Sequence, residues 1–412
     1  EFGVDNEILW LPDVFGYSAA LPQILQKCGI PYFMTTKISW NEFNKMPYDT
    51  FEWEGIDGSR VLTHFVPTRD YNKAAVEGGT ETEHFTTYNG YINPSQMKGA
   101  WARYSQKYLN EEVLCSFGFG DGGGGPTKDM LENQRRLAKG LPGMPRTKMS
   151  TAKEFFHVLD KHVTDKKYLP TWVGELYLEY HRGTYTSMAR NKKFNRKAEF
   201  AYQNEEMYAM LDAQTAGGAY PEKELHEGWE VILRNQFHDI LPGSSIHEVY
   251  EQTKKEYAEI AETSAKLIGE RMEALCGTKD ESVTVWNTLG HRRNDVVVLG
   301  ETAAEAMTDG TTVYPVQQTK DGAIVYAENL PSKGYQVLRP TSGAAAETPF
   351  AVTEAGEGYT LETPFYTIQI DANGEFTSLF DKENDREVLQ SGTTGNELRI
   401  YCLLYTSDAA DD

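Results

Sequence analysis

Apolar positions in the first 150 residues form short runs that alternate with stretches of helical spacing. The runs of strand-like composition are EILWLP (7–12), PYFMTT (31–36), RVLTHFVP (60–67) and VLCSFGFG (113–120). Helix-like stretches lie at about 100–109 and at 128–139. Strands that alternate with helices in this way predict a βα architecture with parallel strands.

Residues 151–278 have a helical pattern. Their clearest helix is predicted to begin at Ser245, where Glu248 three residues later completes a capping box. The apolar positions that follow share one stripe of this helix: Ile246, Val249, Tyr250, Thr253, Tyr257, Ile260, Leu267, Ile268, Met272 and Leu275. Such a stripe is typical of a face that packs in a helical bundle.

After Gly277 the pattern changes to alternating or fully apolar runs separated by turn sequences. The runs are SVTVWN, DVVVLG, TTVYPVQ, AIVYAE and YTIQID, and two of the turns are DANGE and TKDGA. We therefore predict an antiparallel β domain at 279–401. The last residues, 402–412, resemble a translated sequencing adapter and are left out of the fold prediction. The predicted fold class is multidomain, with α/β at 1–150, α at 151–278 and β at 279–401.

Composition and charge exclude several classes of function. The 412 residues include no stretch of 18 apolar residues, so no membrane span is expected. The 61 acidic and 40 basic residues give a formal net charge of −21, which would repel nucleic acid and anionic lipid. Four cysteines lie far apart without a CxxC pair, and this favours a reducing, cytoplasmic location over a disulfide framework.

The first candidate for chemistry is Asp13, which follows an apolar run and precedes Phe15-Gly16-Tyr17. A carboxylate just past the end of a strand in a βα unit lies where such folds hold their active sites. Aspartate is also a common helix N-cap, and spacing alone favours that interpretation.

A second candidate is Asp121, which follows the run at 113–120 and precedes four glycines, a proline and a predicted helix. A glycine-rich loop before a helix can hold phosphate, but the Lys-Ser/Thr ending of a P-loop is absent and Asp121 would repel an anion. The remaining interpretations are a flexible loop and an acid held at the end of a strand.

A third candidate pairs His238 with Asp239 at the end of a helical stretch, just before Pro242-Gly243. An imidazole beside a carboxylate suits metal ligation, because the acceptor fixes the ring tautomer. A capped or core histidine is the more common explanation, and no HExxH motif accompanies this pair.

A fourth segment, near residues 171–200, is rich in aromatic and hydrogen-bonding side chains. They are Trp172, Glu175, Tyr177, Glu179, Tyr180, His181, Arg182 and Tyr185. This composition suits a sugar site or aromatic packing beneath a helix start, and the spacing does not choose between them.

Five motifs occur in one order along the chain: WLPDVFGYS, FGFGDGGGGPT, ELYLEYHRGTYTS, NQFHDILPGSS and VTVWNTLGHRR. In wording, order and approximate spacing they closely resemble the α-mannosidases of glycoside hydrolase family 38, in the bacterial and cytosolic branch. The resemblance runs from about residue 1 to about residue 400. It implies a partial (β/α) barrel-like catalytic domain, a helical bundle domain and an antiparallel β-sandwich domain.

The resemblance also implies roles for single residues in a retaining, zinc-assisted hydrolysis of terminal α-linked mannose. Asp13 would be the nucleophile and a zinc ligand, His238 a second zinc ligand, and Asp121 the general acid/base. The implied substrate-binding residues are Phe15, Tyr71, Arg182, Tyr185 and Asp239. The implied partner is an α-mannoside oligosaccharide, and cobalt is the alternative to zinc.

Two features depart from the family pattern. Other branches carry two adjacent aspartates where this chain has Asp121-Gly122, so the acid/base assignment rests on position. The family's HxD motif supplies two further zinc ligands ahead of PDxFG, and the twelve residues before Asp13 contain no such motif. We therefore expect this chain to be a fragment of the catalytic domain that binds zinc weakly and is inactive by itself.

Two other classes of function remain as alternatives. A metal-dependent carbohydrate deacetylase could share a βα barrel with Asp and His ligands, although an HxxxH ligand pair is absent. A non-catalytic glycan-binding protein would tolerate loss of Asp121 and still bind sugar. Neither accounts for all five motifs. Nucleic acid and membranes are not expected as partners, whereas a homo-oligomer is compatible with the sequence.

Overall fold

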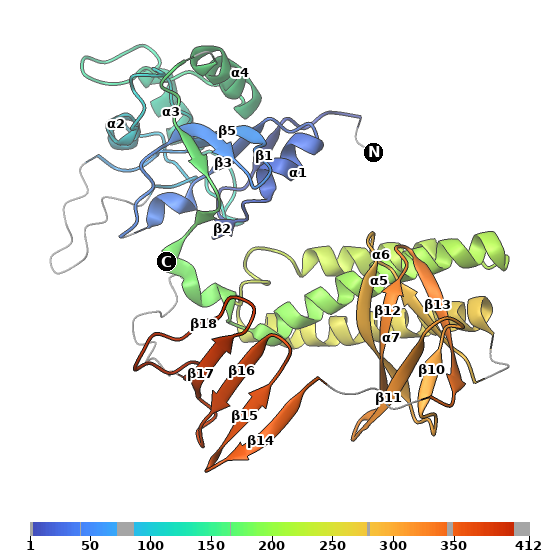
Figure 1. Cartoon of the computed structure of the whole chain (residues 1–412). Coiled ribbons are helices and arrows are strands. Elements are labelled where there is room, and N and C mark those ends of the chain that lie inside the picture. Colours follow the sequence, from blue (N-terminus) through green and yellow to red (C-terminus); the bar gives the residue numbers. More distant parts are fainter. Residues whose placement is uncertain are drawn as a thin grey trace. The chain divides into compact units, whose positions relative to one another are not determined.

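The computed structural model describes residues 3–41, 43–71, 86–164, 166–277, 281–343 and 349–398. They fall into two compact units. The first unit includes Glu1–Lys193 and Arg234–Thr253, and the second includes Phe194–Leu233 and Lys254–Leu404. Figure 1 labels their helices and strands. The tail predicted to be non-native, 402–412, lies outside the described residues.

A five-stranded mixed sheet organises the first unit. Its strands lie in the order β1 (Ile8–Trp10), β3 (Tyr32–Thr35), β5 (Arg60–Phe65), β4 (Thr50–Glu54) and β6 (Thr171–Val173). The β1–β3, β3–β5 and β4–β6 pairs are parallel, whereas β4 and β5 are antiparallel. The strands predicted at 7–12, 31–36 and 60–67 are therefore confirmed as three consecutive parallel strands of the sheet.

The side chains of β3 alternate between two apolar cores. Phe33 packs in one core with Leu25 of α1 (Leu21–Lys27). Met34 packs in the other with Phe156 of α4 (Ala152–Val163). A strand covered on both faces is apolar at successive positions, which explains the uninterrupted run at 31–36.

The first unit contains several smaller elements besides the sheet, α1 and α4. They are α2 (Pro94–Arg103), α3 (Lys128–Leu137), the 3₁₀ helices η1 (Lys37–Trp40) and η3 (Glu179–Tyr185), and the antiparallel pair β2 (Gly16–Tyr17) and β7 (Leu176–Tyr177). The helix predicted at 128–139 is confirmed as α3. The helix expected at about 100–109 instead begins at Pro94, because Asn93 caps it by accepting the Gln96 N–H and proline is favoured in a first turn.

The run at 113–120, predicted as a strand, is not one. Among the described residues its ladder contact is an isolated parallel bridge between Gly90 and Phe117. A strand needs a neighbour to exchange backbone hydrogen bonds along its length, and this segment lacks one within the described part of the chain. The prediction was wrong because β-propensity measures how well residues fit a sheet and does not supply a partner.

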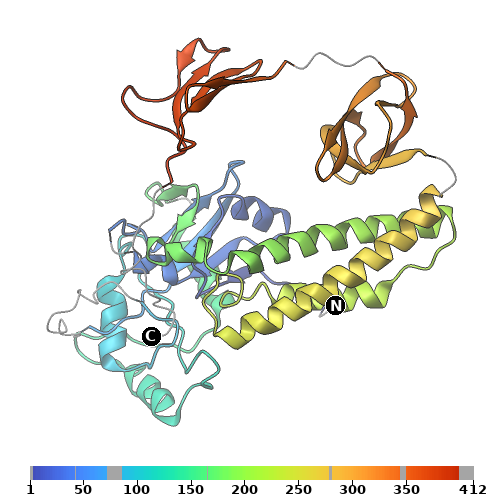
Figure 2. The ribbon, with the colours of Figure 1, turned by 90° about the horizontal axis from the view of Figure 1, so that it is seen from below.

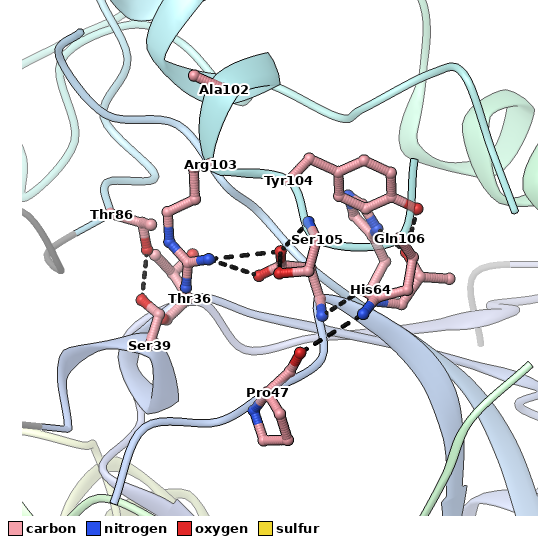
Figure 3. Close-up of polar contacts among 12 residues, drawn as sticks. Thr36, Ser39, Pro47, His64, Thr86, Ala102, Arg103, Tyr104, Ser105 and Gln106 are labelled. Carbon is pink, nitrogen blue, oxygen red and sulfur yellow. Dashed lines mark hydrogen bonds and ion pairs between the residues drawn. The ribbon is translucent and has the colours of Figure 1, made fainter. Parts of the chain in front are cut away.

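A buried polar cluster joins the end of α2 to the start of β4 (Figure 3). The Asp49 carboxylate accepts the backbone N–H and the hydroxyl of Ser105, both at 2.8 Å, and pairs with Arg103 at 3.1 Å. The side-chain oxygen of Gln106 accepts the backbone N–H groups of Asp49 and Thr50 at 2.7 and 2.9 Å. Asp49 and Gln106 are buried, so these bonds satisfy polar groups that water does not reach.

Three helices lie side by side after the first unit's main segment (Figure 2): α5 (Ala189–Thr215), α6 (Glu222–Arg234) and α7 (His247–Cys276). Their core in the second unit includes Tyr202, Leu225 and Ile260. A Cβ on Gly228 of α6 would lie only 2.1 Å from the Tyr202 hydroxyl, so glycine permits this close approach. The helical middle region is confirmed. None of the described helices has the length and apolar character of a membrane span.

The N-terminus of α7 differs in detail from the prediction. The helix begins at His247, close to the expected start. However, the Ser245 backbone N–H donates to the Tyr250 hydroxyl at 2.8 Å, in the place that the capping box gave to Glu248. A side chain one turn into the helix thus satisfies this donor.

Two antiparallel sheets complete the second unit. One has the order β8 (Val283–Asn287), β13 (Gly334–Thr341), β10 (Ala306–Thr308), β11 (Val313–Thr319), β12 (Gly322–Leu330) and β9 (Arg293–Gly300). The other has the order β14 (Ala351–Ala355), β15 (Gly358–Glu362), β16 (Tyr366–Ile370), β17 (Phe376–Asp381) and β18 (Arg386–Glu387). The five predicted runs correspond to β8, β9, β11, β12 and β16. The antiparallel β region is confirmed, while barrel-like and sandwich closure remain predictions.

Replacing Gln106 by leucine should destabilise the first unit, because two buried backbone N–H groups lose their acceptor. An unsatisfied buried donor costs about 1–3 kcal/mol, so we expect the free energy of unfolding to fall by about 2–4 kcal/mol. Denaturant titration followed by circular dichroism measures the change. The matched control is Gln203→Leu on the exposed surface of α5, which should shift the value by less than about 0.5 kcal/mol. Equal losses in the two variants would contradict this role.

The second unit contains a buried acid without hydrogen-bond partners. Glu205 of α5 is 1% exposed, and neither of its carboxylate oxygens has a partner among the described residues. Burial raises the pKa of Glu205 to about 7, the Arg271 charge opposes this rise, and Glu270 and Asp212 add to it. The Arg271 guanidinium lies 3.4 Å from the Asp212 carboxylate, so its positive charge is divided between Asp212 and Glu205.

The stability of the second unit should therefore decrease as pH rises through about 7. The folded-state pKa of Glu205 lies above the ordinary 4.5, so the neutral form favours the fold. Its contribution is complete below the unfolded-state pKa and is lost above the folded-state pKa. Thermal melting should be recorded at pH values between the ordinary pKa of 4.5 and about 7. Over this range the melting temperature of wild type should fall more steeply with pH than that of Glu205→Gln. The exposed Glu262→Gln on α7 should behave like wild type, and parallel curves for all three would rule the effect out.

Candidate active site

The C-terminal edge of the parallel strands brings two charged residues together. Asp13 follows β1 and Lys37 follows β3, and because these strands are parallel neighbours both segments leave the sheet at one edge. The backbone N–H groups of Thr36 and Lys37 donate to the Pro12 carbonyl at 3.2 and 3.3 Å, which fixes one segment against the other. The residue that caps α1 is Ala20, so the interpretation of Asp13 as a helix cap is wrong.

Both oxygens of the Asp13 carboxylate have donors within reach. Lys37 Nζ lies 3.0 Å from Oδ1, and the Tyr88 hydroxyl donates to Oδ2 at 2.8 Å. His238 Nε2 lies 3.4 Å from the same Oδ2. Burial raises the pKa of Asp13, but the contact with His238 and the charge of Lys37 outweigh burial, so the pKa is lowered. Asp13 is therefore a carboxylate at neutral pH.

His238 meets Asp13 from a distant part of the sequence, between α6 and α7. Two ligands of one zinc ion, each about 2.0–2.2 Å from it, lie within about 4 Å of each other, and His238 Nε2 is 3.4 Å from Asp13 Oδ2. The carboxylate of Asp239 is also 3.4 Å from His238 Nε2. The contact with Asp13 raises the pKa of His238, burial opposes this rise, and Asp239 supports it.

The turn that carries His238 is held by side chains of neighbouring elements. The Tyr250 hydroxyl donates to the Ile240 carbonyl at 3.3 Å, and Lys192 Nζ donates to the Leu241 carbonyl at 2.8 Å. Gly243 has a φ of 93°, and a Cβ there would lie 2.7 Å from the Ser187 side chain. Glycine is therefore required at the point where this turn passes the start of α5.

Tyr88 connects Asp13 to the second candidate carboxylate. Its hydroxyl lies 2.8 Å from Asp121 Oδ1, and Asn89 Nδ2 donates to Asp121 Oδ2 at 3.0 Å. Because one oxygen of each carboxylate is 2.8 Å from the Tyr88 hydroxyl oxygen, the nearest carboxylate oxygens of Asp13 and Asp121 are no more than twice 2.8 Å apart. Burial, followed by the hydrogen bonds to the two carboxylates, raises the pKa of Tyr88, so the phenol keeps its proton.

The loop around Asp121 is shaped by its close neighbours. Asp121 has a φ of 54°, and a Cβ on Gly120 would lie 2.1 Å from the Asn89 side chain. The cap of α3 is Thr127, which accepts the Met130 N–H, so Asp121 is free of a capping role. The glycine run thus lets the loop pass against Asn89 and present Asp121 to Tyr88.

Thr86 anchors the segment that carries Tyr88 to η1 (Figure 3). The Thr86 and Ser39 hydroxyls are 2.6 Å apart, and since Ser39 donates its proton to the Thr36 carbonyl, Thr86 is the donor between them. The Thr86 carbonyl accepts the indole N–H of Trp40 at 3.0 Å, and Lys37 Nζ lies 3.5 Å from the centre of that Trp40 ring. Thr86 thus fixes the segment that carries Tyr88 and also the Trp40 ring on which Lys37 packs. One buried threonine therefore helps to position two partners of Asp13.

The predicted substrate-binding residues are only partly gathered here. The Phe15 ring centre lies 4.7 Å from that of His181 and 6.3 Å from that of His238, so Phe15 borders the site. A Cβ on Gly16 would be 3.6 Å from the Tyr185 hydroxyl, which places that hydroxyl next to the residue that follows Phe15.

The contacts of Arg182 and Tyr71 are with residues other than Asp13 and Asp121. Arg182 is exposed and pairs with Glu179 at 3.8 Å, and Tyr71 is exposed with Lys98 Nζ 4.0 Å from its ring centre. Within the described part of the chain, neither is hydrogen-bonded or ion-paired to Asp13. The assignment of Arg182 and Tyr71 as substrate-binding residues stays a prediction.

Three residues of this site were not identified from the sequence: Lys37, Tyr88 and Asn89. Lys37 had a usable signal, because it follows an apolar strand just as Asp13 does. Tyr88 and Asn89 follow no strand among the described residues, so no pattern could select them.

Family models and curated relatives match the chain over most of its length. A model of the glycosyl hydrolases family 38 N-terminal domain matches residues 1–175, and a model of the alpha mannosidase middle domain matches residues 179–275. The chain is 36% identical to Alpha-mannosidase 2C1 of Homo sapiens over 408 residues, which are 97% of this chain and 36% of that protein. It is 34% identical to Alpha-mannosidase G of Dictyostelium discoideum, over 98% of this chain and 39% of that protein.

The fold has a counterpart among solved structures. The crystal structure of an alpha-mannosidase from Enterococcus faecalis V583 superposes on 94% of this chain and 49% of its own, with a TM-score of 0.61 and 16% identity. The chain thus spans a little over a third of the length of the two curated relatives and about half of this structure. The two family models together cover most of the residues and include Asp13, Asp121 and His238. On this evidence the chain belongs to glycoside hydrolase family 38.

Proposed function

We propose that the site formed by Asp13, Asp121 and His238 belongs to a retaining, zinc-dependent α-mannosidase that acts on terminal α-linked mannose of oligosaccharides. The observation that carries this proposal is the pair of carboxylates joined through the Tyr88 hydroxyl, one of them beside a histidine. The choice of mannose as the sugar rests on the names of the relatives, since all of those above are α-mannosidases.

The distance between the carboxylates supports a retaining mechanism. Retaining glycosidases hold their two carboxyl groups about 5–5.5 Å apart, whereas inverting enzymes need about 6.5–9.5 Å to admit a water molecule. The bonds through Tyr88 limit the nearest oxygens of Asp13 and Asp121 to twice 2.8 Å. This limit favours direct attack by one carboxylate on the sugar.

The surroundings of Asp13 and Asp121 suit different roles for the two acids. Tyr88 has one proton, which it can donate to Asp13 or to Asp121, each 2.8 Å from its hydroxyl. The lowered pKa of Asp13 assigns the ionised state to Asp13. Asp121 accepts from Tyr88 at Oδ1 and from Asn89 at Oδ2, and the proposed acid role requires that it carry a proton before the sugar is attacked. An ionised nucleophile and a protonated acid are the starting states that retention requires.

The reaction then follows from these states. The Asp13 carboxylate attacks the anomeric carbon while Asp121 donates its proton to the glycosidic oxygen, and the bond to the leaving group breaks. The sugar is now an ester of Asp13. In the second step the Asp121 carboxylate removes a proton from water, the water oxygen bonds to the anomeric carbon, and the Asp13 ester bond breaks. Two inversions at one carbon give retention.

The residues present fit two of the ligands of a zinc ion. Family 38 is generally metal-dependent, and a carboxylate oxygen with an imidazole nitrogen 3.4 Å away matches ligands that each lie about 2.0–2.2 Å from a shared zinc. Bound zinc would act as a Lewis acid that orients the sugar hydroxyls. Among the described residues no group of three or more His, Cys, Asp or Glu is arranged to hold a metal, so Asp13 and His238 are the two we assign.

The proposed function is tested by incubating α-linked mannosides with the longest form of the protein that can be expressed. We expect release of mannose that a chelator abolishes and that added zinc or cobalt restores. Hydrolysis that is indifferent to the chelator would contradict the metal assignment. Hydrolysis of other glycosides in preference to mannosides would contradict the substrate.

In any active form of the protein, Asp13→Asn should lower kcat by about a thousandfold or more, because the nucleophile is lost. Asp121→Asn should spare the first step for substrates with very good leaving groups and slow the second, since that step needs the base. Added azide should restore turnover of Asp121→Asn only. Retention of a tenth of kcat by Asp13→Asn, or equal losses of Asp121→Asn on activated and natural substrates, would show that these roles lie elsewhere.

The 412-residue chain by itself should bind zinc weakly, with a Kd above about 1 µM, because it offers two assigned ligands where zinc sites have at least three. Isothermal titration of the chelator-treated chain measures this, and His238→Ala should weaken binding further. Submicromolar binding of one zinc per chain would show that further ligands exist within the chain.

A further inference from the structure

One phenol lies between the two candidate carboxylates. The Tyr88 hydroxyl oxygen is 2.8 Å from Asp13 Oδ2 and also 2.8 Å from Asp121 Oδ1. In both contacts the hydroxyl is the donor, and a phenol carries a single proton. Tyr88 can therefore make a full hydrogen bond to one carboxylate at a time, and the equal distances give neither acceptor an advantage of position.

The other partners of the two carboxylates differ in kind. Asp13 has the charged Lys37 at 3.0 Å from Oδ1 and His238 at 3.4 Å from Oδ2. Among the described residues, Asp121 has hydrogen bonds from Tyr88 and from the uncharged Asn89 amide, and no ion pair. Tyr88 is therefore the donor that the protein offers to Oδ1 of Asp121 when that acid becomes ionised.

In the proposed reaction, on which this inference rests, negative charge moves from one carboxylate to the other. Before the first step Asp13 is ionised and Asp121 holds a proton. After it, Asp13 is an uncharged ester and Asp121 is ionised, because its proton has gone to the leaving group. The second step reverses both changes. One of the two acceptors of the Tyr88 proton is thus ionised at each stage, and its identity changes with every step.

We propose that the Tyr88 hydroxyl donates to whichever of Asp13 and Asp121 is ionised, and that it changes acceptor in each chemical step. The change requires rotation of the hydroxyl about the Cζ–Oη bond, since both acceptors already lie at hydrogen-bond distance. Tyr88 keeps its proton throughout. The proton that reaches the leaving group comes from Asp121, and the proton that returns to Asp121 comes from water. A donor that is already in place costs little reorganisation when charge arrives.

The stability of the 412-residue chain tests this sharing of one donor without turnover and without zinc. Tyr88→Phe is made in four backgrounds: wild type, Asp13→Asn, Asp121→Asn and the variant with both asparagines. Denaturant titration gives the loss of stability that the phenylalanine causes in each background. Because either carboxylate alone can accept the proton, the losses in the first three backgrounds should be equal. In the fourth the loss should be about half as large, since a hydrogen bond to a neutral acceptor is roughly half as strong as one to an ionised acceptor.

Other patterns of loss would overturn the inference. Equal losses in all four backgrounds would show that the Tyr88 hydroxyl has a merely structural role. Thr86→Val should give that pattern as a control, because the Thr86 hydroxyl bonds to Ser39 and to neither carboxylate. A loss that disappears with Asp13→Asn alone, or with Asp121→Asn alone, would show a fixed donor that serves one acid.

A kinetic measurement decides the matter if one of these variants fails to fold, and it separates the inference from the proposed function. In the longest form of the protein that can be expressed, charge forms on Asp121 during the first step when the leaving group needs its proton. Tyr88→Phe should therefore lower kcat/KM about tenfold or more for natural mannosides, and less than about threefold for mannosides with very good leaving groups.

The kinetic control is Tyr168→Phe, which removes the hydroxyl of an exposed tyrosine and should change neither value. Equal losses of kcat/KM on the two kinds of mannoside in Tyr88→Phe would overturn the inference, while hydrolysis by wild type would leave the proposed function standing. If wild type hydrolyses neither mannoside, the proposed function fails and the inference that rests on it fails too.

Discussion

The partly buried charge of Asp13 is the constraint on which this site depends. A carboxylate that has lost most of its contact with water is costly unless other groups supply charge and hydrogen bonds. Lys37, Tyr88 and His238 supply them, each within 3.4 Å. These three residues come from segments far apart in the sequence, so the carboxylate is stable only when the tertiary fold has brought all of them into place.

The fold meets this requirement with one edge of a sheet and two anchored segments. Parallel β1 and β3 place Asp13 and Lys37 at the same edge. Thr86 holds the Tyr88 segment against η1, and Tyr250 holds the turn that follows His238. Thr86 and Tyr250 do not touch the sugar in the proposed mechanism, but they decide whether the reacting groups are correctly placed. Groups that are held in place beforehand lose less entropy when the reaction takes place.

The same arrangement gives the site a direction. Asp13 lies at its buried end, between a cation and a histidine, and Asp121 lies at its exposed end in a glycine loop. Tyr88 joins the two, and Asn89 continues the network outward. In the proposed mechanism a sugar held beside Asp13 has its leaving group beside Asp121, in the exposed loop.

The amino-acid sequence by itself determined the parallel strands around 7–12, 31–36 and 60–67, the helical middle region and the antiparallel strands that follow, because each depends on local spacing of apolar residues. It also identified Asp13, Asp121 and His238 through short motifs, although their roles remain proposals. Only the tertiary structure decided that 113–120 forms no strand, since a strand needs a partner. Only the tertiary structure showed that Lys37, Tyr88 and Asn89 complete the site, because contacts between distant segments leave no periodic signal in a sequence.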